Sequence, residues 1–165
     1  MTVLIHNRQR TYSVHLDRLE ALLHDILERL GQRNGELSLL LVNDRAMRAY
    51  NRRYLGGSGA TDVISFPQYS GDIGAIATAI DMDMQQGREI LLGDVIISIE
   101  TLWKRTGNDC ERFSRDLAET SVHAVLHLLG YDHATPLEET QMKARSATLM
   151  GKLAIPDLTG KGGGR

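Results

Sequence analysis

Residues 121–133 read SVHAVLHLLGYDH and contain three of the six histidines of the chain. His123 and His127 are four residues apart, so on a helix they share one face with Cβ atoms about 5–6 Å apart. On an uninterrupted helix His133 would lie about 15 Å further along the axis, out of reach of that face. Gly130 can adopt a left-handed backbone conformation and reverse the chain. The spacing therefore predicts a helix, a glycine stop and a return that brings His133 to the other two histidines.

A histidine pair at this spacing is, by itself, more typical of a polar helix face than of a metal site. The third histidine and the glycine favour metal binding, and three imidazoles suit one zinc ion per chain at about 2.0–2.1 Å per bond. The spacing is that of the elongated zinc-protease motif, H-E-x-x-H-x-x-G-x-x-H, except that Ala124 replaces the glutamate. That glutamate is the general base of those proteases. We therefore expect His123, His127 and His133 to bind zinc, with a zinc-bound water as the reactive group; no protein general base is assigned.

The pattern of apolar residues predicts an α+β domain, in which helices alternate with the strands of a small mixed sheet. Strands are expected at about residues 2–5, 36–42, 63–66 and 89–97, and helices at about 16–30, 44–54, 98–105, 111–129 and 136–150. Residues 75–84 fit either a short helix or a lid. Gly93 interrupts the fourth strand, which indicates a β-bulge or a close approach of the backbone to a ligand.

Composition indicates one ordinary globular domain. The chain has 165 residues, 42% hydrophobic and 24% charged. We expect residues 1–157 to form a single domain and residues 158–165, which are rich in glycine, to form a disordered tail. The single cysteine, Cys110, excludes an intrachain disulfide and a thiolate zinc cluster. With no signal-peptide pattern and no apolar run of about 18 residues, the expected location is the cytoplasm, without a membrane partner.

The charge is distributed unevenly although the formal net charge is only −2. Arg45, Arg48, Arg52 and Arg53 crowd the second expected helix. The pattern fits a solvated helix face and fits a ridge that binds phosphate groups. Since no global positive field is present, an RNA substrate would have to be held by such a local patch.

Three motifs resemble one family. Residues 123–133, HAVLHLLGYDH, are similar to the H-G-x-L-H-L-x-G-Y-D-H signature of the YbeY family, the bacterial endoribonuclease and rRNA maturation factor. TDVISFP at residues 61–67 resembles its T-D-V-L-S-F-P, and LGDV at residues 92–95 resembles its L-G-D-I. The likeness spans about residues 36–150. It implies a zincin-like metal site on four strands, mainly parallel with one antiparallel edge strand, packed with about five helices.

The resemblance also implies a function. It implies a single-strand-specific, zinc-dependent endoribonuclease that matures the 3′ end of 16S rRNA and takes part in ribosome quality control. Its partners would be RNA and the small ribosomal subunit, not DNA; nothing indicates an oligomeric state. Many family members carry an arginine where this chain has Leu55, so we expect the nearby Arg52 or Arg53 to contact the RNA backbone near the metal. The alternatives are a metallopeptidase-like hydrolase and a non-catalytic ribosome-assembly factor whose metal is structural.

Overall fold

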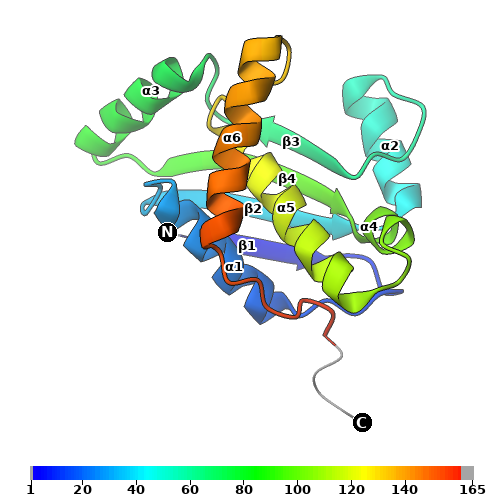
Figure 1. Cartoon of the computed structure of the whole chain (residues 1–165). Helices are drawn as coiled ribbons and strands as arrows, with labels where there is room; N and C mark the ends of the chain where they lie inside the picture. Colours follow the sequence, from blue (N-terminus) through cyan, green and yellow to red (C-terminus); the bar gives the residue numbers. More distant parts are fainter. Residues whose placement is uncertain (1, 161–165) are drawn as a thin grey trace.

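A four-stranded sheet in the order β1-β2-β4-β3 forms the centre of the structure, a computed structural model that describes residues 2–160 (Figure 1). The strands are β1 (Thr2–Asn7), β2 (Gly35–Val42), β3 (Val63–Pro67) and β4 (Ile90–Ser98). The β1–β2 and β2–β4 pairs are parallel, and β3 is antiparallel to β4 at one edge. The mixed, mostly parallel sheet with an antiparallel edge strand is therefore confirmed.

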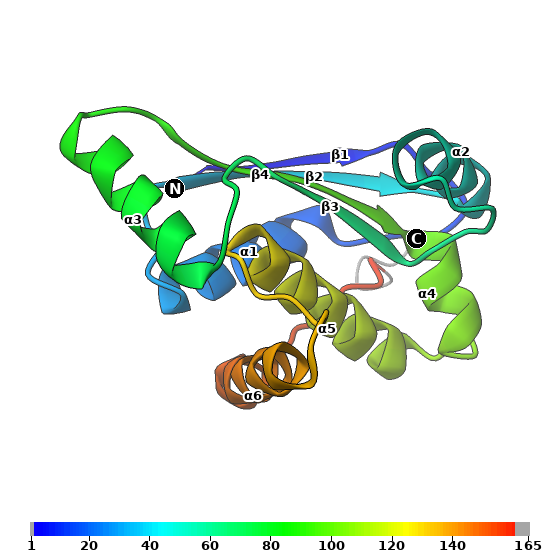
Figure 2. The ribbon, with the colours of Figure 1, turned by 90° about the horizontal axis from the view of Figure 1, so that it is seen from above.

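Six helices are described. Helices α1 (Leu16–Arg29), α4 (Ile99–Arg105), α5 (Cys110–Leu128) and α6 (Pro136–Lys152) lie on one side of the sheet, with α6 outside α5 (Figure 2). Helix α2 (Asp44–Leu55) lies near one end of the sheet, and α3 (Ile73–Gln85) lies at the other end. The helix beyond the expected five is α3, so the ambiguous residues 75–84 belong to a helix.

Side chains alternate between the two faces of the sheet, and each face has its own hydrophobic cluster. In β2, Leu37, Leu39 and Leu41 are almost fully buried and belong to the main core between the sheet, α1 and α5. Side chains of successive strand residues point to opposite faces. The opposite face therefore has its own small cluster, in which Met47 of α2 packs on three strand residues, Val42, Ile64 and Ile96.

Polar contacts fix the start of α2. The Asn43 side chain accepts the backbone N–H of Ala46 (2.9 Å) and caps the helix. The Asp44 carboxylate, mostly buried, accepts hydrogen bonds from Ser98 Oγ (2.7 Å) and Lys104 Nζ (3.1 Å), and also from the Thr101 hydroxyl. Burial opposes ionisation of Asp44, but these hydrogen bonds outweigh it and hold the pKa of the carboxyl below its usual value.

Gly93 is required by close packing between strands. Its φ of 143° lies in a region that L side chains rarely adopt, and an added Cβ would collide with the carbonyl oxygen of Phe66 in β3. The register also shifts between Glu36 and Leu37 of the neighbouring strand, which marks a bulge. The register shift beside Gly93 agrees with the expected β-bulge, and the backbone that closely approaches Gly93 is that of β3.

The segment after α6 returns across the domain. Leu158 is fully buried, its N–H donates to Ser114 Oγ (2.9 Å), and its carbonyl accepts the N–H of His15 (2.9 Å). Residues 158–160 are therefore packed, so the expected start of the tail at residue 158 is too early. The rest of that expected tail, residues 161–165, lies outside the described residues. Within the described residues, no helix combines the length and apolar character needed to cross a membrane.

Candidate metal centre

Helix α5 carries the first two histidines at its C-terminal end. Asp109 caps the helix by accepting the N–H of Arg112 (2.8 Å), and a continuous apolar face that includes Phe113 and Leu117 is buried in the core. This packing leaves His123 and His127 half-buried on the adjoining face, with ring centroids 4.7 Å apart. The pairing expected from their i,i+4 spacing is therefore present.

A glycine turn follows the helix as the spacing predicted. Gly130 has φ of 94°, its N–H donates to the carbonyl of His127 (3.1 Å), and the N–H of Tyr131 donates to the carbonyl of Leu126 (3.1 Å). The last of these bonds is the six-to-one bond of a Schellman-type helix end. A Cβ added to Gly130 would lie 2.9 Å from the backbone nitrogen of Ile73, at the start of α3. The turn is thus held by local hydrogen bonds and by a neighbouring helix.

The turn returns His133 to the histidine pair. Its ring centroid lies 5.2 Å from that of His127 and 6.1 Å from that of His123. One ring nitrogen from each of the three side chains lies within 4.8 Å of the others. Two nitrogens on one tetrahedral zinc are about 3.3 Å apart at about 2.0–2.1 Å per bond, so small side-chain rotations bring the cluster to ligand distance. The donor set fits a metal ion, and within the described residues it consists of these three histidines alone.

Asp132 supports the turn. Its carboxylate accepts the backbone N–H of His133 (2.7 Å), and the same oxygen lies 3.9 Å from Nδ1 of that histidine. An acceptor beside a ligating imidazole orients the ring and raises its basicity.

The electrostatics of the cluster favour neutral imidazoles. Burial lowers the pKa of His123, and the nearby His133 lowers it further, against a smaller opposing effect of Asp62. Burial also lowers the pKa of His127, together with both other histidines of the cluster. Neutral imidazole is the form that ligates a metal, so the site disfavours the proton that would compete with the ion.

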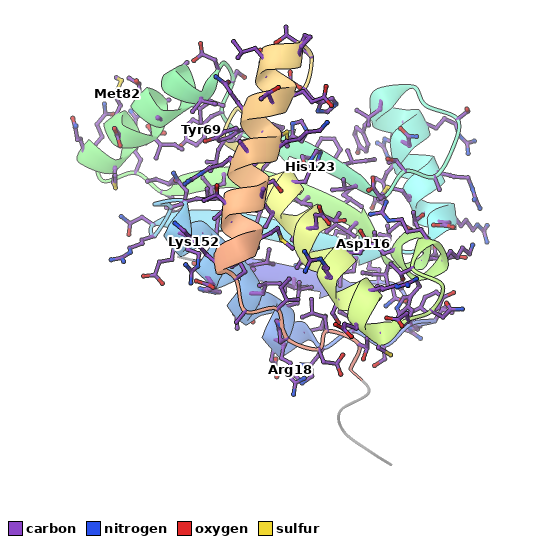
Figure 3. The ribbon with its side chains drawn as sticks, viewed as in Figure 1. Arg18, Tyr69, Met82, Asp116, His123 and Lys152 are labelled. Carbon is purple, nitrogen blue, oxygen red and sulfur yellow. The ribbon has the colours of Figure 1, made fainter. Side chains whose placement is uncertain are left out.

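Two hollows meet at His123. A cleft of about 770 Å³ between α5 and α6 is bordered by His123 and His133, and its walls include Arg115, Glu119 and Met150. A second hollow, of about 210 Å³, lies toward β3 and is bordered by His123, Asp62, Arg105, Asp116 and Glu119. Figure 3 shows His123 and Asp116 on α5, with α6 crossing beside His123. The cluster therefore faces open space on two sides.

Sequence reasoning missed the charged group beside the cluster. Arg105 of α4 donates to Asp116 of α5 (2.6 Å) and to Asp62, just before β3 (2.8 Å). These contacts raise the pKa of the Arg105 guanidinium, with the hydrogen bond to Asp116 as the largest cause. Asp62, in the TDVISFP motif, was the only member of this group that the sequence singled out. Arg105 and Asp116 come from other elements, which the fold brings next to it.

Ala124 lies where a zinc protease has its glutamate. It is buried, and its carbonyl is 3.5 Å from the Ser65 hydroxyl of β3, which donates to it. The position therefore faces the packed contact between α5 and β3.

Arg52 and Arg53 lie elsewhere. Both are exposed in the last turn of α2, and neither borders the two hollows at His123. The structure thus gathers the three predicted metal ligands but keeps the two predicted RNA-contacting arginines apart from them.

A family model and two curated relatives that match this chain carry the same family name. The model of the family described as endoribonuclease YbeY matches residues 4–154. A curated endoribonuclease YbeY of Anaeromyxobacter dehalogenans is 38% identical over 132 residues, which cover 80% of this chain and 61% of that relative. A second, from Desulforamulus reducens, is 33% identical over 159 residues, which cover 94% of this chain and 99% of the relative.

The chain thus spans about six-tenths of the length of the first relative and nearly all of the second. Among solved structures, the solution structure of a Thermotoga maritima protein is similar, with a TM-score of 0.53 and 19% sequence identity over 92% of this chain and 91% of that one. At this identity the likeness shows a shared fold alone. The match of the family over nearly the whole described chain shows that this protein belongs to the endoribonuclease YbeY family.

Proposed function

We propose that the protein is a zinc-dependent endoribonuclease that cleaves single-stranded RNA, through one site in one domain. The observation that carries the proposal is the cluster of His123, His127 and His133, bordered by two hollows. Family membership supports RNA as the substrate, because the similar curated proteins are named endoribonucleases.

The three histidines would hold the zinc ion and leave a fourth position open, as in catalytic rather than structural zinc sites. A bound zinc ion supplies a Lewis acid and lowers the pKa of water to about 7. The chain's own residues prepare the site: burial lowers the pKa values of His123 and His127, and Asp132 accepts a hydrogen bond in the turn that carries His133. No protein side chain is assigned as general base.

Arg105 reduces the negative charge of the smaller hollow beside His123. Three carboxylates, those of Asp62, Asp116 and Glu119, border the same hollow as His123 and would repel a phosphodiester. The ion pairs of Asp62 and Asp116 with Arg105 offset one of these three negative charges next to His123.

The finer assignment follows the family. We propose maturation of the 3′ end of 16S rRNA as the reaction, the small ribosomal subunit as the partner, and the cytoplasm as the location. The names of the relatives support cleavage of RNA. The choice of the 3′ end of 16S rRNA as the cleaved site goes beyond those names and is part of the proposal.

A panel of three substrates tests the proposal. Zinc-loaded protein should cut single-stranded RNA and leave duplex RNA and casein intact, a chelator should abolish cutting, and added zinc should restore it. The variant H127A should neither retain zinc nor cut RNA. Cleavage of casein would indicate a metallopeptidase, and one tightly bound zinc without cleavage of any substrate would indicate a structural metal in an assembly factor.

A further inference from the structure

An exposed aromatic side chain stands at the end of α2. Tyr54 is 51% exposed, the largest side chain among the exposed hydrophobic residues of the described chain. Its ring is stacked beside that of Tyr50 (centroids 6.2 Å apart) and lies edge-to-face with Phe66 of β3 (5.3 Å). We call these three residues the aromatic platform. Two elements thus build it, and Tyr54 is its exposed member.

Positive charge accompanies the platform. The guanidinium carbon of Arg53 lies 5.4 Å from the centroid of the Tyr54 ring, a cation–π distance. Arg52 and Arg53 are exposed, and among the described residues no carboxylate lies within 4.0 Å of either guanidinium. By contrast, Arg105 beside the histidines is fully engaged by two aspartates. The charges at the end of α2 therefore remain available to an external anion.

The platform lies on the opposite face of β3 from the metal centre. Ser65 contacts the carbonyl of Ala124, between the two helical histidines, whereas Phe66, the next residue, belongs to the platform. Successive strand residues point to opposite faces, and β3 is the edge strand of the sheet. The histidines and Tyr54 are thus on opposite sides of the edge strand, and a strand that engages both has to pass the margin of the sheet.

The end of α2 is held in place before any ligand binds. Gly56 closes the helix in a left-handed conformation, and its N–H donates to the carbonyl of Asn51. The Asn51 side chain in turn donates to the carbonyl of Gly59 (2.7 Å), which restrains the loop that follows. A site whose groups are already ordered loses less entropy when it binds.

We propose that Tyr54 stacks an unpaired base of the RNA substrate while Arg53 and Arg52 contact the adjoining phosphates. The inference rests on the proposed nuclease function and adds a substrate subsite to it. Exposed aromatic rings beside arginines are the common means of binding single strands, because every base has a face to stack and every nucleotide a phosphate. In a duplex the bases are already stacked on one another, so the subsite favours unpaired RNA.

Binding of a fluorescent oligonucleotide tests the subsite. The probe is a single-stranded 2′-O-methyl RNA that contains 2-aminopurine, a base whose fluorescence is quenched when it stacks. A gel shows whether the probe stays intact when it is incubated with the zinc-loaded protein. Tyr54→Ala should raise the dissociation constant about 5- to 150-fold and relieve quenching, whereas Tyr54→Phe should retain both. Met82→Ala is the matched control, because Met82 is 53% exposed and lies on α3, at the other end of the sheet (Figure 3).

The outcomes separate the subsite from the nuclease. Zinc content should be equal in all variants, and cleavage of unmodified RNA by the parent is measured in parallel. If Tyr54→Ala binds within about twofold of the parent with the same quenching, the subsite is overturned even when the parent cleaves RNA. If the probe depends on Tyr54 but the parent does not cleave RNA, the subsite stands and the nuclease proposal fails. A parent that does not bind the probe overturns the subsite.

Discussion

Helices α5 and α2 both end at a glycine with positive φ, and both present polar groups in their last turn. Gly130 after α5 has φ of 94° and touches the backbone at the start of α3, whereas Gly56 after α2 has φ of 65° and open space where a Cβ would be. The first turn must return a ligand to within bonding distance of two others. The second only has to end a helix beside a surface. The Gly130 turn is thus fixed by close packing against α3, whereas the Gly56 turn is held by hydrogen bonds within its own segment.

The largest expected effect comes from replacing one of the proposed zinc ligands on α5. His127→Ala should lower zinc affinity by more than about 100-fold, since loss of residues that merely support ligands already costs about 10- to 100-fold. Competition with a chromophoric chelator measures the affinity. His24→Ala serves as the control, because His24 lies on α1 beside Glu20. One zinc per chain at unchanged affinity in His127→Ala would contradict the assignment.

The two glycines can be compared directly. Gly130→Ala should reduce the free energy of unfolding by about 2–4 kcal/mol, because left-handed strain of about 1–2 kcal/mol adds to a collision with α3. Gly56→Ala should cost about 1–2 kcal/mol, from the strain alone. Urea denaturation of the metal-free variants provides both values. Equal losses would show that contact with α3 does not stabilise the Gly130 turn.

The α2 side is tested by charge removal. Arg52→Gln with Arg53→Gln should weaken binding of single-stranded RNA and flatten its log–log salt dependence by about one unit for each phosphate group that the variant no longer binds. Arg45→Gln with Arg48→Gln, on the same helix but away from its end, should leave the slope nearly unchanged. Bound zinc should stay at one per chain in both variants. Identical slopes for the parent and the Arg52/Arg53 variant would show that these arginines do not bind phosphate groups and only form a solvated helix face.

The smallest expected effect is a pH dependence confined to the α5 side. The pKa values of His123 and His127 in the folded protein lie below the ordinary value of about 6.5. At a pH between the folded and the ordinary pKa values, the unfolded chain therefore binds more protons than the native one. The free energy of unfolding of the metal-free protein should therefore fall as pH falls below about 6.5. Zinc affinity should also weaken below about pH 6.

Denaturation at pH 7.5 and 5.5 measures this decline. His123→Gln should make it shallower, although Asp62 and Asp132 partly favour the protonated rings. A decline that is unchanged in His123→Gln would assign it to other groups.

The cluster of three histidines was predictable because its geometry is local. A helical period, one glycine and a short return decide the positions of all three histidines, and each step follows from sequence spacing. The contact of Gly130 with Ile73 was not predictable, because it depends on how a helix from another part of the chain packs. The same holds for Arg105, whose partners Asp62 and Asp116 belong to separate segments.

The sheet was predicted more completely than the segments at the margins of the fold. Continuous runs of apolar residues in the sequence indicate buried strands, and the four strands lie near their expected positions. Helix α3 exposes Ile73, Met82 and Met84, so its apolar residues do not mark one face and its type stayed ambiguous. The start of the tail was misplaced because a glycine-rich composition concealed Leu158, one apolar residue that is fully buried.

The free edge of β3 has a consequence for the solubility of the protein. An uncovered edge strand exposes unpaired backbone groups that can recruit a strand from another molecule and start aggregation. β3 has only five residues and ends at Pro67, which has no N–H to offer to an added strand. Such an edge is a poor template for intermolecular sheet growth, so it can remain unpaired.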